Sequence, residues 1–404
     1  MAQRSRRSGL FILLAIVLVL AAVAAWLWLR KPVGPATTTA LHLTPASYAD
    51  LPGWSSADLS AALAAFKRSC GDLAKKNPTA LMGGAGYAGT VGDWLEACRA
   101  APQSGSEARR FFEAMFTPVA VNKDTDDGLF TGYYEPELHL SHTQHGAFQT
   151  PIYGVPDDLI TVDLGLFKDS LKGEHVTGRV QGTTLIPYAD RAEINRKGLP
   201  HAQVLAWSDD PVSVFFLHIQ GSGRAAFDDG SAGRIAYAGQ NGRPYTPIGR
   251  TLIREGAMQK ADLSMQGIRI WLKAHPDQAQ RIMETDASFV FFDEEPLGDA
   301  ALGANGSEGV PLTPGASLAV DQHVHALGVP LWLSLDEHST ALPRNRLMIA
   351  QDTGGAIKGA VRGDVYFGFG EKPEWNAGHM KAAGAMFVLL PKDLARKLPA
   401  EFRP

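Results

Sequence analysis

The chain has 404 residues, of which 45% are hydrophobic and 20% are charged, a composition typical of a globular protein with one large domain or two. Five of its 38 Lys and Arg residues lie before residue 32, so the remainder carries 33 basic against 42 acidic side chains. This net charge of −9 argues against nucleic acid or an anionic membrane surface as the partner. Two cysteines cannot by themselves build a structural zinc site. The many glycines and prolines favour tight turns between short strands.

An apolar run opens the chain. Leu10 to Leu29 contains no charged residue and is flanked by basic residues on both sides, and its length is enough to span a bilayer. We interpret residues 1–31 as a membrane anchor, with a signal peptide cleaved near residues 22–24 as the alternative. The basic tip is expected to stay in the cytoplasm, which places the rest of the chain in the periplasm. Residues 32–49 lack charged side chains and indicate a flexible linker.

A helical layer is expected after the linker. Apolar residues recur at helical spacing from Leu59 to Leu73, and similar patterns follow over Val91 to Arg99 and Glu107 to Phe116. Cys70 and Cys98 fall in two of these segments. In an oxidising compartment they either join two packed helices by a disulfide or remain buried free thiols.

Strands dominate the rest of the chain. From Leu129 onward, short apolar runs alternate with turn residues, and Val212 to Ile219 is one expected strand. Helices are predicted at Ile248 to Arg254, Met265 to Ala274 and Asp277 to Glu284. Leu297 to Pro314 is expected to be a Gly-rich loop. The later strands are predicted at Ser288 to Phe292, Ser317 to Val320, Pro330 to Leu335, Leu347 to Gln351 and Met386 to Leu390.

Three aspartates mark the C-terminal strands. Asp321 and Asp352 each follow an apolar strand, and Asp364 lies between a glycine and an aromatic strand. Glycines next to such an acid let another chain approach, which places the carboxylate in a cleft and removes part of its water. Desolvation raises the pKa of an aspartate, as an acid catalyst near neutral pH requires. Each aspartate alone is also consistent with the capping of a turn.

Taken together, these motifs resemble the membrane-bound lytic transglycosylase A family. The three aspartates resemble the three-aspartate module of a double-psi barrel, and further matching motifs lie at residues 130–136, 150–153, 216–223 and 241–245. The resemblance runs in consistent order over roughly residues 110 to 392. The lipidated cysteine that usually anchors the family is absent, and the apolar N-terminal segment stands in its place.

The resemblance implies a mainly β fold of the α+β class, with helices at the periphery. Its main catalytic domain would be a double-psi β-barrel assembled from residues 50–137 and 286–404. A smaller β-barrel domain, residues 138–285, would be inserted into it. The glycan groove would lie between the two domains, with Asp364 on the wall of the main domain.

The implied reaction cleaves the β-1,4 bond between N-acetylmuramic acid and N-acetylglucosamine and forms 1,6-anhydromuramoyl ends without water. By resemblance Asp364 is the catalytic acid and then base, and Asp352 is a supporting residue. No metal or organic cofactor is required. The expected partners are peptidoglycan glycan strands, the membrane through the N-terminal helix, and regulatory or cell-wall synthesis proteins that the sequence does not identify.

A glycan strand needs aromatic faces and hydrogen-bonding groups along its groove. The candidates are residues inside the matching motifs or next to the aspartates. An aromatic side chain among them is also consistent with packing in the core, and a charged one with exposure to solvent. The predicted substrate-binding residues are Tyr133, Tyr134, Glu135, Gln220, Gly221, Ser222, Asp321 and Lys358.

Some of these residues are also consistent with other functions. Asp352-Thr353-Gly354 resembles the active-site turn of aspartic proteases, but the chain has no second such turn. His323 and His325, with Glu337 and His338, form a weak candidate for a metal site. The stronger alternatives are a non-catalytic peptidoglycan-binding wall protein and a muramidase that uses water and a second carboxylate.

Overall fold

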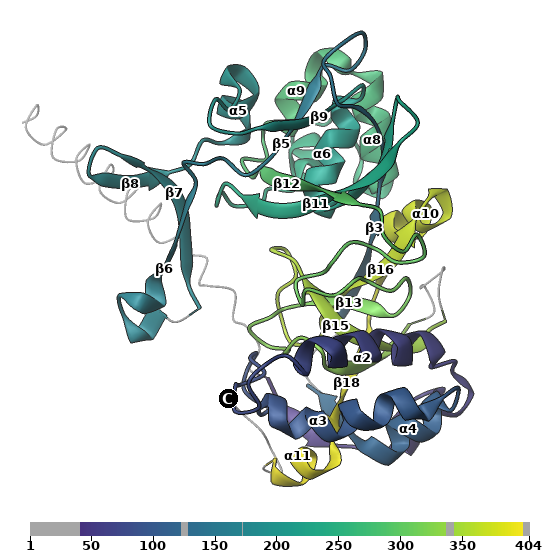
Figure 1. Ribbon diagram of the computed structural model, residues 1–404. Helices are drawn as coiled ribbons and strands as arrows, with labels where there is room; N and C mark the ends of the chain where they lie inside the picture. Colours follow the sequence, from purple (N-terminus) through teal and green to yellow (C-terminus); the bar gives the residue numbers. More distant parts are fainter. Residues whose placement is uncertain (1–40, 123–127, 172, 337–342, 399–404) are drawn as a thin grey trace, which may run out of the picture. The chain divides into compact units, whose positions relative to one another are not determined.

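The structure is a computed structural model that describes residues 41–122, 128–171, 173–336 and 343–398. The described residues form one compact unit (Figure 1). The predicted anchor, residues 1–31, lies outside the described residues, as does most of the predicted linker. Within the described ranges, no helix combines the length and the apolar character needed to cross a membrane.

A nine-stranded sheet forms the core of the unit, in the order β1-β2-β18-β14-β15-β13-β16-β3-β17. It combines strands from both ends of the chain: β1 (Leu43–Pro45), β2 (Phe116–Val121), β3 (Leu129–Glu135), β13 (Ser317–Val320), β14 (Pro330–Leu335), β15 (Asn345–Thr353), β16 (Arg362–Phe369), β17 (Lys381–Ala382) and β18 (Gly384–Pro391). The predicted C-terminal strands are confirmed, because β13 and β14 have the expected bounds and β15 and β18 contain the others. Their apolar runs are buried.

Helices cover one side of this sheet, as predicted. α2 (Ser60–Leu73), α3 (Val91–Ala100) and α4 (Ala108–Met115) pack against β15, β18 and β2 (Figure 1). α10 (Glu371–His379) lies beside β3 and β16, and α11 (Lys392–Lys397) beside β2 and β18. α2, α3 and α4 each bury an apolar stripe and leave their polar face to water. Short 3-10 helices occur at Tyr48–Asp50, Trp54–Ser56, Ala101–Ser104, Leu164–Leu166, Asp169–Leu171 and Lys260–Asp262.

A second, six-stranded sheet has the order β12-β11-β10-β4-β9-β5. Its strands are β4 (Glu137–Ser141), β5 (Thr150–Tyr153), β9 (Val204–Ser208), β10 (Gly223–Phe227), β11 (Ala232–Gln240) and β12 (Val290–Pro296), and α5 (Arg191–Lys197) lies within the same stretch of chain. β12 begins two residues later than predicted. The mainly β fold with peripheral helices is thus confirmed, whereas the division into two barrel domains stays a prediction.

The strand predicted at Val212 to Ile219 is wrong, because this segment is the helix α6 (Pro211–Gln220). The Asp210 side chain accepts a hydrogen bond from the Val212 amide, and Pro211 occupies the first turn, where a missing N–H costs nothing. Gly221 ends the helix with a left-handed φ of 83°. Periodicity could not reveal this, since α6 packs both on the six-stranded sheet and on other helices, so its apolar residues are not confined to one helical stripe.

The other predicted helices of this region are confirmed as α7 (Ile248–Arg254), α8 (Met265–Ala274) and α9 (Pro276–Met283). They enclose an apolar cluster with α6 that includes Phe215, Leu252 and Ile282. The loop predicted at Leu297 to Pro314 is also confirmed, because it contains only an isolated bridge between Asn305 and Pro311.

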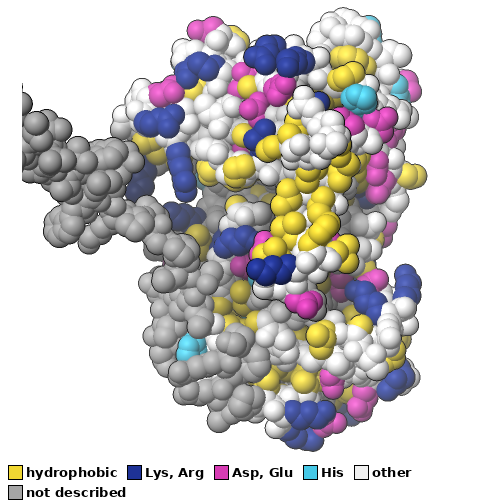
Figure 2. Space-filling view, turned by 90° about the vertical axis from the view of Figure 1, so that its left-hand side faces the viewer, with side chains coloured by type: hydrophobic (Ala, Val, Ile, Leu, Met, Phe, Trp, Pro, Cys, Tyr) yellow, Lys and Arg dark blue, Asp and Glu magenta, His cyan; other side chains and the backbone are white. Residues whose placement is uncertain are grey.

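A small three-stranded sheet projects from the unit (Figure 1). It consists of β6 (Ile160–Asp163), β7 (His175–Gln181) and β8 (Thr184–Pro187). Figure 2 views the side on which this arm projects, and apolar side chains gather there. Exposed apolar side chains of the arm are Ile160, Leu166, Phe167, Val176, Val180 and Leu185.

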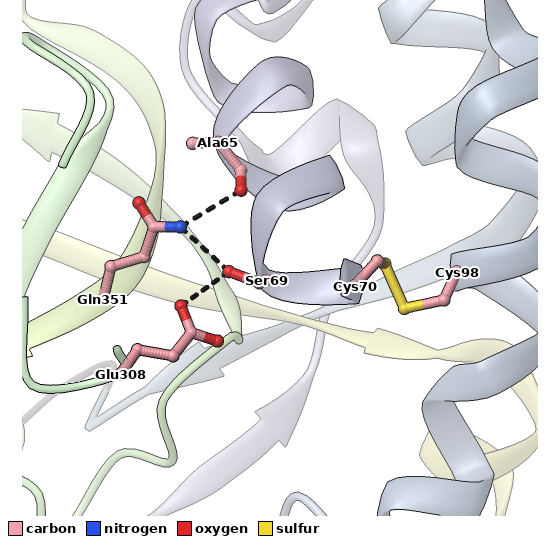
Figure 3. The surroundings of a disulfide bond; sticks show 6 residues. All are labelled: Ala65, Ser69, Cys70, Cys98, Glu308 and Gln351. Atoms are coloured by element: carbon pink, nitrogen blue, oxygen red, sulfur yellow. Dashed lines mark hydrogen bonds between the residues drawn. A yellow bond between two sulfur atoms is a disulfide. The ribbon is translucent and has the colours of Figure 1, made fainter. Parts of the chain in front are cut away.

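Cys70 and Cys98 form a disulfide that joins α2 to α3 (Figure 3). Their Cα atoms are 5.1 Å apart, and the bond closes a loop with a sequence separation of 28 residues. Of the two readings that the sequence allows, the structure therefore has the disulfide. The bond links two helices of the layer to each other.

Replacing both cysteines by serine is expected to lower the free energy of unfolding by about 3 kcal/mol, because the open loop gives the unfolded chain more conformations. Denaturant unfolding under oxidising conditions measures this loss. Added reductant should destabilise the wild type and leave the double variant unchanged. Equal stability of the two proteins would contradict the prediction.

Candidate active site

Strand register places Asp352 and Asp364 on either side of Ala319. β13 runs between β15 and β16, and Ala319 lies opposite Asp352 on one side and opposite Asp364 on the other. Residues directly opposite one another point to the same face of a sheet. With neighbouring strands about 4.8 Å apart, the two aspartate backbones lie about 10 Å apart. The strand β13 lies between them, and the side chain that it places there is the methyl group of Ala319.

A β-bulge produces this alignment. Leu318 is opposite Ala350 and Ala319 is opposite Asp352, so Gln351 is an extra residue on β15. Its buried side chain turns to the helix-covered side, where it donates to the carbonyl oxygen of Ala65. A bulge changes the direction of the neighbouring side chain, and here the neighbour is Asp352.

Asp364 is a half-buried carboxyl group with few partners. The Thr131 hydroxyl donates to its Oδ1 over 2.7 Å, and Arg362 donates in turn to the Thr131 hydroxyl over 2.8 Å. Burial raises the pKa of Asp364, the Arg362 charge and the Thr131 hydrogen bond oppose this rise, and the charge of Asp352 adds to it. The net effect favours the protonated form, which a general acid needs.

Asp352 is held by more donors than Asp364. The Tyr133 hydroxyl donates to Oδ2 over 2.8 Å, and the amide and hydroxyl of Ser307 donate to Oδ1 over 3.0 and 2.9 Å. Burial raises the pKa of Asp352, and the bonds from Tyr133 and Ser307 oppose it. The two aspartates thus occupy different environments, one fixed through both oxygens and the other through one.

Tyr133 reaches Asp352 from a distant strand. It lies on β3 opposite Tyr366 of β16, with ring centroids 5.2 Å apart. Two strands, β13 and β16, separate β3 from β15 in the sheet order. A flat sheet would keep the two backbones about 14 Å apart, so the hydrogen bond requires a strongly curved sheet. Curvature therefore encloses the carboxylates.

Glu135 is buried and fully engaged. Its carboxylate binds Arg224 over 3.3 Å and Arg234 over 2.6 Å. Both arginines also donate to the carbonyl oxygen of Leu302. β3 carries Glu135, and the six-stranded sheet carries the two arginines. The cluster therefore joins the two sheets, and through Leu302 it also holds the loop that follows β12. This position speaks against a direct contact with a glycan.

Tyr134 points away from Tyr133, as successive strand residues must. Its side chain is 2% exposed, and its hydroxyl accepts a hydrogen bond from Arg269. Its amide donates to the side chain of Gln220 at the end of α6. The predicted motif around Gln220 therefore fastens α6 to β3. Tyr134 has no exposed ring for a glycan, whereas Gly221 and Ser222 are partly exposed.

Asp321 organises the loop between β15 and β16. Its carboxylate accepts hydrogen bonds from the amides of His323 and Gly359, and it is buried. The Lys358 Nζ atom lies 3.9 Å from Asp321, while the Lys358 side chain is 55% exposed. Asp321 thus shapes the loop, and Lys358 remains available to a ligand.

The metal reading of the histidines finds no support among the described residues. His325 is buried, and its two ring nitrogens contact the Tyr87 hydroxyl and the Ala360 carbonyl oxygen. Glu337 and His338 lie outside the described residues. A separate group of possible ligands, Asp157, Asp158 and His201, lies in a different region, near β6 and β9, and is largely exposed.

Four residues of the site were missed from the sequence. Thr131 lies within a recognised motif, and Arg362 precedes Asp364 by two residues, the spacing of one strand face. Ala319 carried no signal because its role depends on register. Ser307 lies in a loop and is brought to Asp352 only by the fold.

Two hollows of about 730 and 470 Å³ lie on the six-stranded sheet and its helices. Neither is lined by Asp352 or Asp364. The predicted groove between two domains is therefore not represented by either hollow, and it stays a prediction.

Comparisons with known proteins match these regions. Residues 129–293 match the family model described as the MltA specific insert domain, and residues 316–390 match the 3D domain. The chain is 34% identical over 267 residues to membrane-bound lytic murein transglycosylase A of Escherichia coli K12, and 31% identical over 270 residues to that of Vibrio cholerae. These matches cover 64% and 65% of this chain, and they span just under two thirds, 65%, of each curated relative.

Solved structures are similar over a larger share of the chain. A membrane-bound lytic murein transglycosylase from Agrobacterium tumefaciens has 31% identity and a TM-score of 0.78, over 88% of this chain and 99% of that one. MltA from Neisseria gonorrhoeae has 33% identity and a TM-score of 0.74, over 90% and 95%. E. coli MltA with bound chitohexaose has 28% identity and a TM-score of 0.61, over 81% and 90%. The chain belongs to the membrane-bound lytic murein transglycosylase A family.

Proposed function

We propose that this chain is a peptidoglycan lytic transglycosylase with Asp364 as its acid and base. One observation carries the proposal: a half-buried carboxyl group with a raised pKa stands across Ala319 from a second carboxylate. Membership of the family supports the same activity. The substrate would be the β-1,4 bond between N-acetylmuramic acid and N-acetylglucosamine.

The reaction would need one proton donor that later takes the proton back. Protonated Asp364 would give its proton to the glycosidic oxygen as the bond from that oxygen to muramoyl C1 breaks. The muramoyl 6-hydroxyl would then attack C1, and its proton would pass to the Asp364 carboxylate. The 1,6-anhydro ring closes, no water is consumed, and Asp364 returns to its protonated form.

Asp352 would assist without exchanging protons. The donors from Tyr133 and Ser307 favour its ionised form. A fixed negative charge near Asp364 raises the pKa of that acid, and it also favours the positive charge that develops at the anomeric carbon. Burial raises the pKa of both aspartates, and the additional donors to Asp352 would leave Asp364 as the one that keeps its proton more readily.

The substrate is proposed to be a glycan strand of peptidoglycan in the periplasm. The relative from E. coli with bound chitohexaose supports a site for several sugar rings. Lys358, which is exposed, and Ser222, which is partly exposed, remain candidate contacts, because both leave polar groups open to a ligand. We also propose attachment to the membrane through the N-terminal segment and a groove between the two predicted domains.

An Asp364→Asn variant is expected to lose peptidoglycan cleavage by about 100- to 10,000-fold, because an amide cannot donate and recover the proton. The full-length protein is incubated with purified peptidoglycan, and the released muropeptides are weighed by mass spectrometry. An anhydro end is one water lighter than a hydrolysed end, so the product identifies the reaction.

Asp229→Asn is the matched control, because Asp229 is exposed in a turn outside the site and asparagine also caps turns. It should cleave like the wild type. Reducing ends would indicate a muramidase that uses water, and binding without release would indicate a non-catalytic wall protein. Cleavage by Asp364→Asn at the wild-type rate would overturn the assignment of the acid.

The pH profile should respond to Arg362. Its charge lowers the pKa of Asp364, so Arg362→Gln should raise that pKa and keep Asp364 protonated to higher pH. The fall in activity at alkaline pH should therefore move upward in Arg362→Gln, while Arg362→Lys, which retains the charge, should move it less. Rates of muropeptide release across a pH series measure the effect, and a downward movement would contradict the proposed acid.

A further inference from the structure

A turn over the end of β15 links the candidate active site to the helical layer. The turn is closed by the bridge between Asn305 and Pro311 and contains Ser307 and Glu308. A side chain at Gly306 would lie within 2.4 Å of the Gln351 carbonyl oxygen, so only glycine permits this approach. The Glu308 amide donates to the same carbonyl oxygen over 3.0 Å. The turn is thus built tightly onto β15.

Ser307 and Glu308 contact opposite sides of this strand. Ser307 donates twice to Asp352 on the face of the candidate site. Glu308 sends its side chain to the other side, where it is only 6% exposed. The side chains of the two residues therefore lie on opposite sides of the end of β15. Because Glu308 and Ser307 are adjacent in the chain, a displacement of Glu308 would also move Ser307, which donates to Asp352.

The Glu308 carboxyl group is hydrogen-bonded to α2. The Ser69 hydroxyl donates to Glu308 Oε2 over 2.7 Å, and the Gln351 side chain donates to the same hydroxyl over 2.9 Å (Figure 3). Ser69 precedes Cys70, whose disulfide holds α2 to α3. The anchor point therefore lies next to the covalent link between the two helices.

We propose that Glu308 is a positioning residue of the active site, which fixes the turn at Ser69 so that Ser307 holds Asp352 beside Asp364. The inference rests on the proposed function and deepens it. Glu308 would not touch substrate. It would act by limiting the motion of Ser307, because catalytic groups must be held by neighbours whose own positions are fixed.

The surroundings of Glu308 favour its neutral form. Burial raises its pKa to about 7, the hydrogen bond from Ser69 and the Lys76 charge oppose this, and the Asp72 charge adds to it. Its Oε1 atom has no hydrogen-bond partner among the described residues. A side chain at Gly328 would lie within 2.8 Å of that atom, so little space is left around it. Glutamine therefore resembles the neutral carboxyl group in shape and charge.

The first test replaces Glu308 in the full-length protein and measures the initial rate of anhydromuropeptide release. Glu308→Ala should lower kcat by about 10- to 100-fold with little change in KM, because the turn loses its anchor while the glycan contacts remain. Glu308→Gln should stay within about threefold of the wild type, since it keeps an acceptor for Ser69. Glu174→Ala, an exposed glutamate on the distant arm, is the matched control and should match the wild type.

A double-variant cycle then tests the route through Ser307. If Glu308 acts by way of Ser307, the losses in Glu308→Ala and Ser307→Ala overlap, and the double variant loses less than the product of the two single losses. Independent losses that multiply would overturn this route. Wild-type kcat in Glu308→Ala would overturn the inference, whereas an inactive wild type would overturn the proposed function itself.

Stability against pH provides a readout independent of activity. Between pH 4.5, the ordinary pKa of a glutamate, and about 7, the folded protein keeps a proton on Glu308 that the unfolded chain releases. The wild type should therefore lose stability relative to Glu308→Gln as the pH rises through this window, and the difference should level off above it. A constant difference in Tm from pH 4 to 8 would contradict the neutral buried state.

Discussion

The pairing of β13 with both β15 and β16 is the constraint on which the site depends. Ala319 sets Asp352 and Asp364 at the same height on the same face, and the bulge at Gln351 is needed for that register. Successive residues of β13 and of the apolar part of β15 are all buried, so a slip of one residue would exchange the side chains packed on the two faces. The apolar runs of these strands thus specify where the acids stand.

Buried ionic groups join this framework to the second sheet. Glu135 between Arg224 and Arg234 shows how such a group is tolerated, since a buried charge is costly unless it is paired and hydrogen-bonded. The same arginines hold the loop that leads to Ser307. The buried ion pairs of Glu135 are therefore connected, through this loop, to the residue that positions Asp352.

The three aspartates of this region differ in the hydrogen bonds that they accept. Asp321 is buried and accepts backbone amides, Asp352 is held by three donors, and Asp364 receives a bond at one oxygen among the described residues. A carboxyl group with few donors in a desolvated site keeps its proton most readily. Identical side chains are thus placed in different environments by their hydrogen bonds.

Local patterns in the sequence determined the helical layer and the C-terminal strands, and they marked Asp352 and Asp364 as candidates, because periodicity and acids at strand ends are encoded in neighbouring residues. Tertiary structure decided the rest. The apolar segment of α6 became a helix through its caps and its burial on two sides. Tyr134 and Glu135 lie inside the protein, and Ser307 reaches Asp352, because contacts between residues far apart in the chain depend on register and packing. No short sequence pattern carries that information.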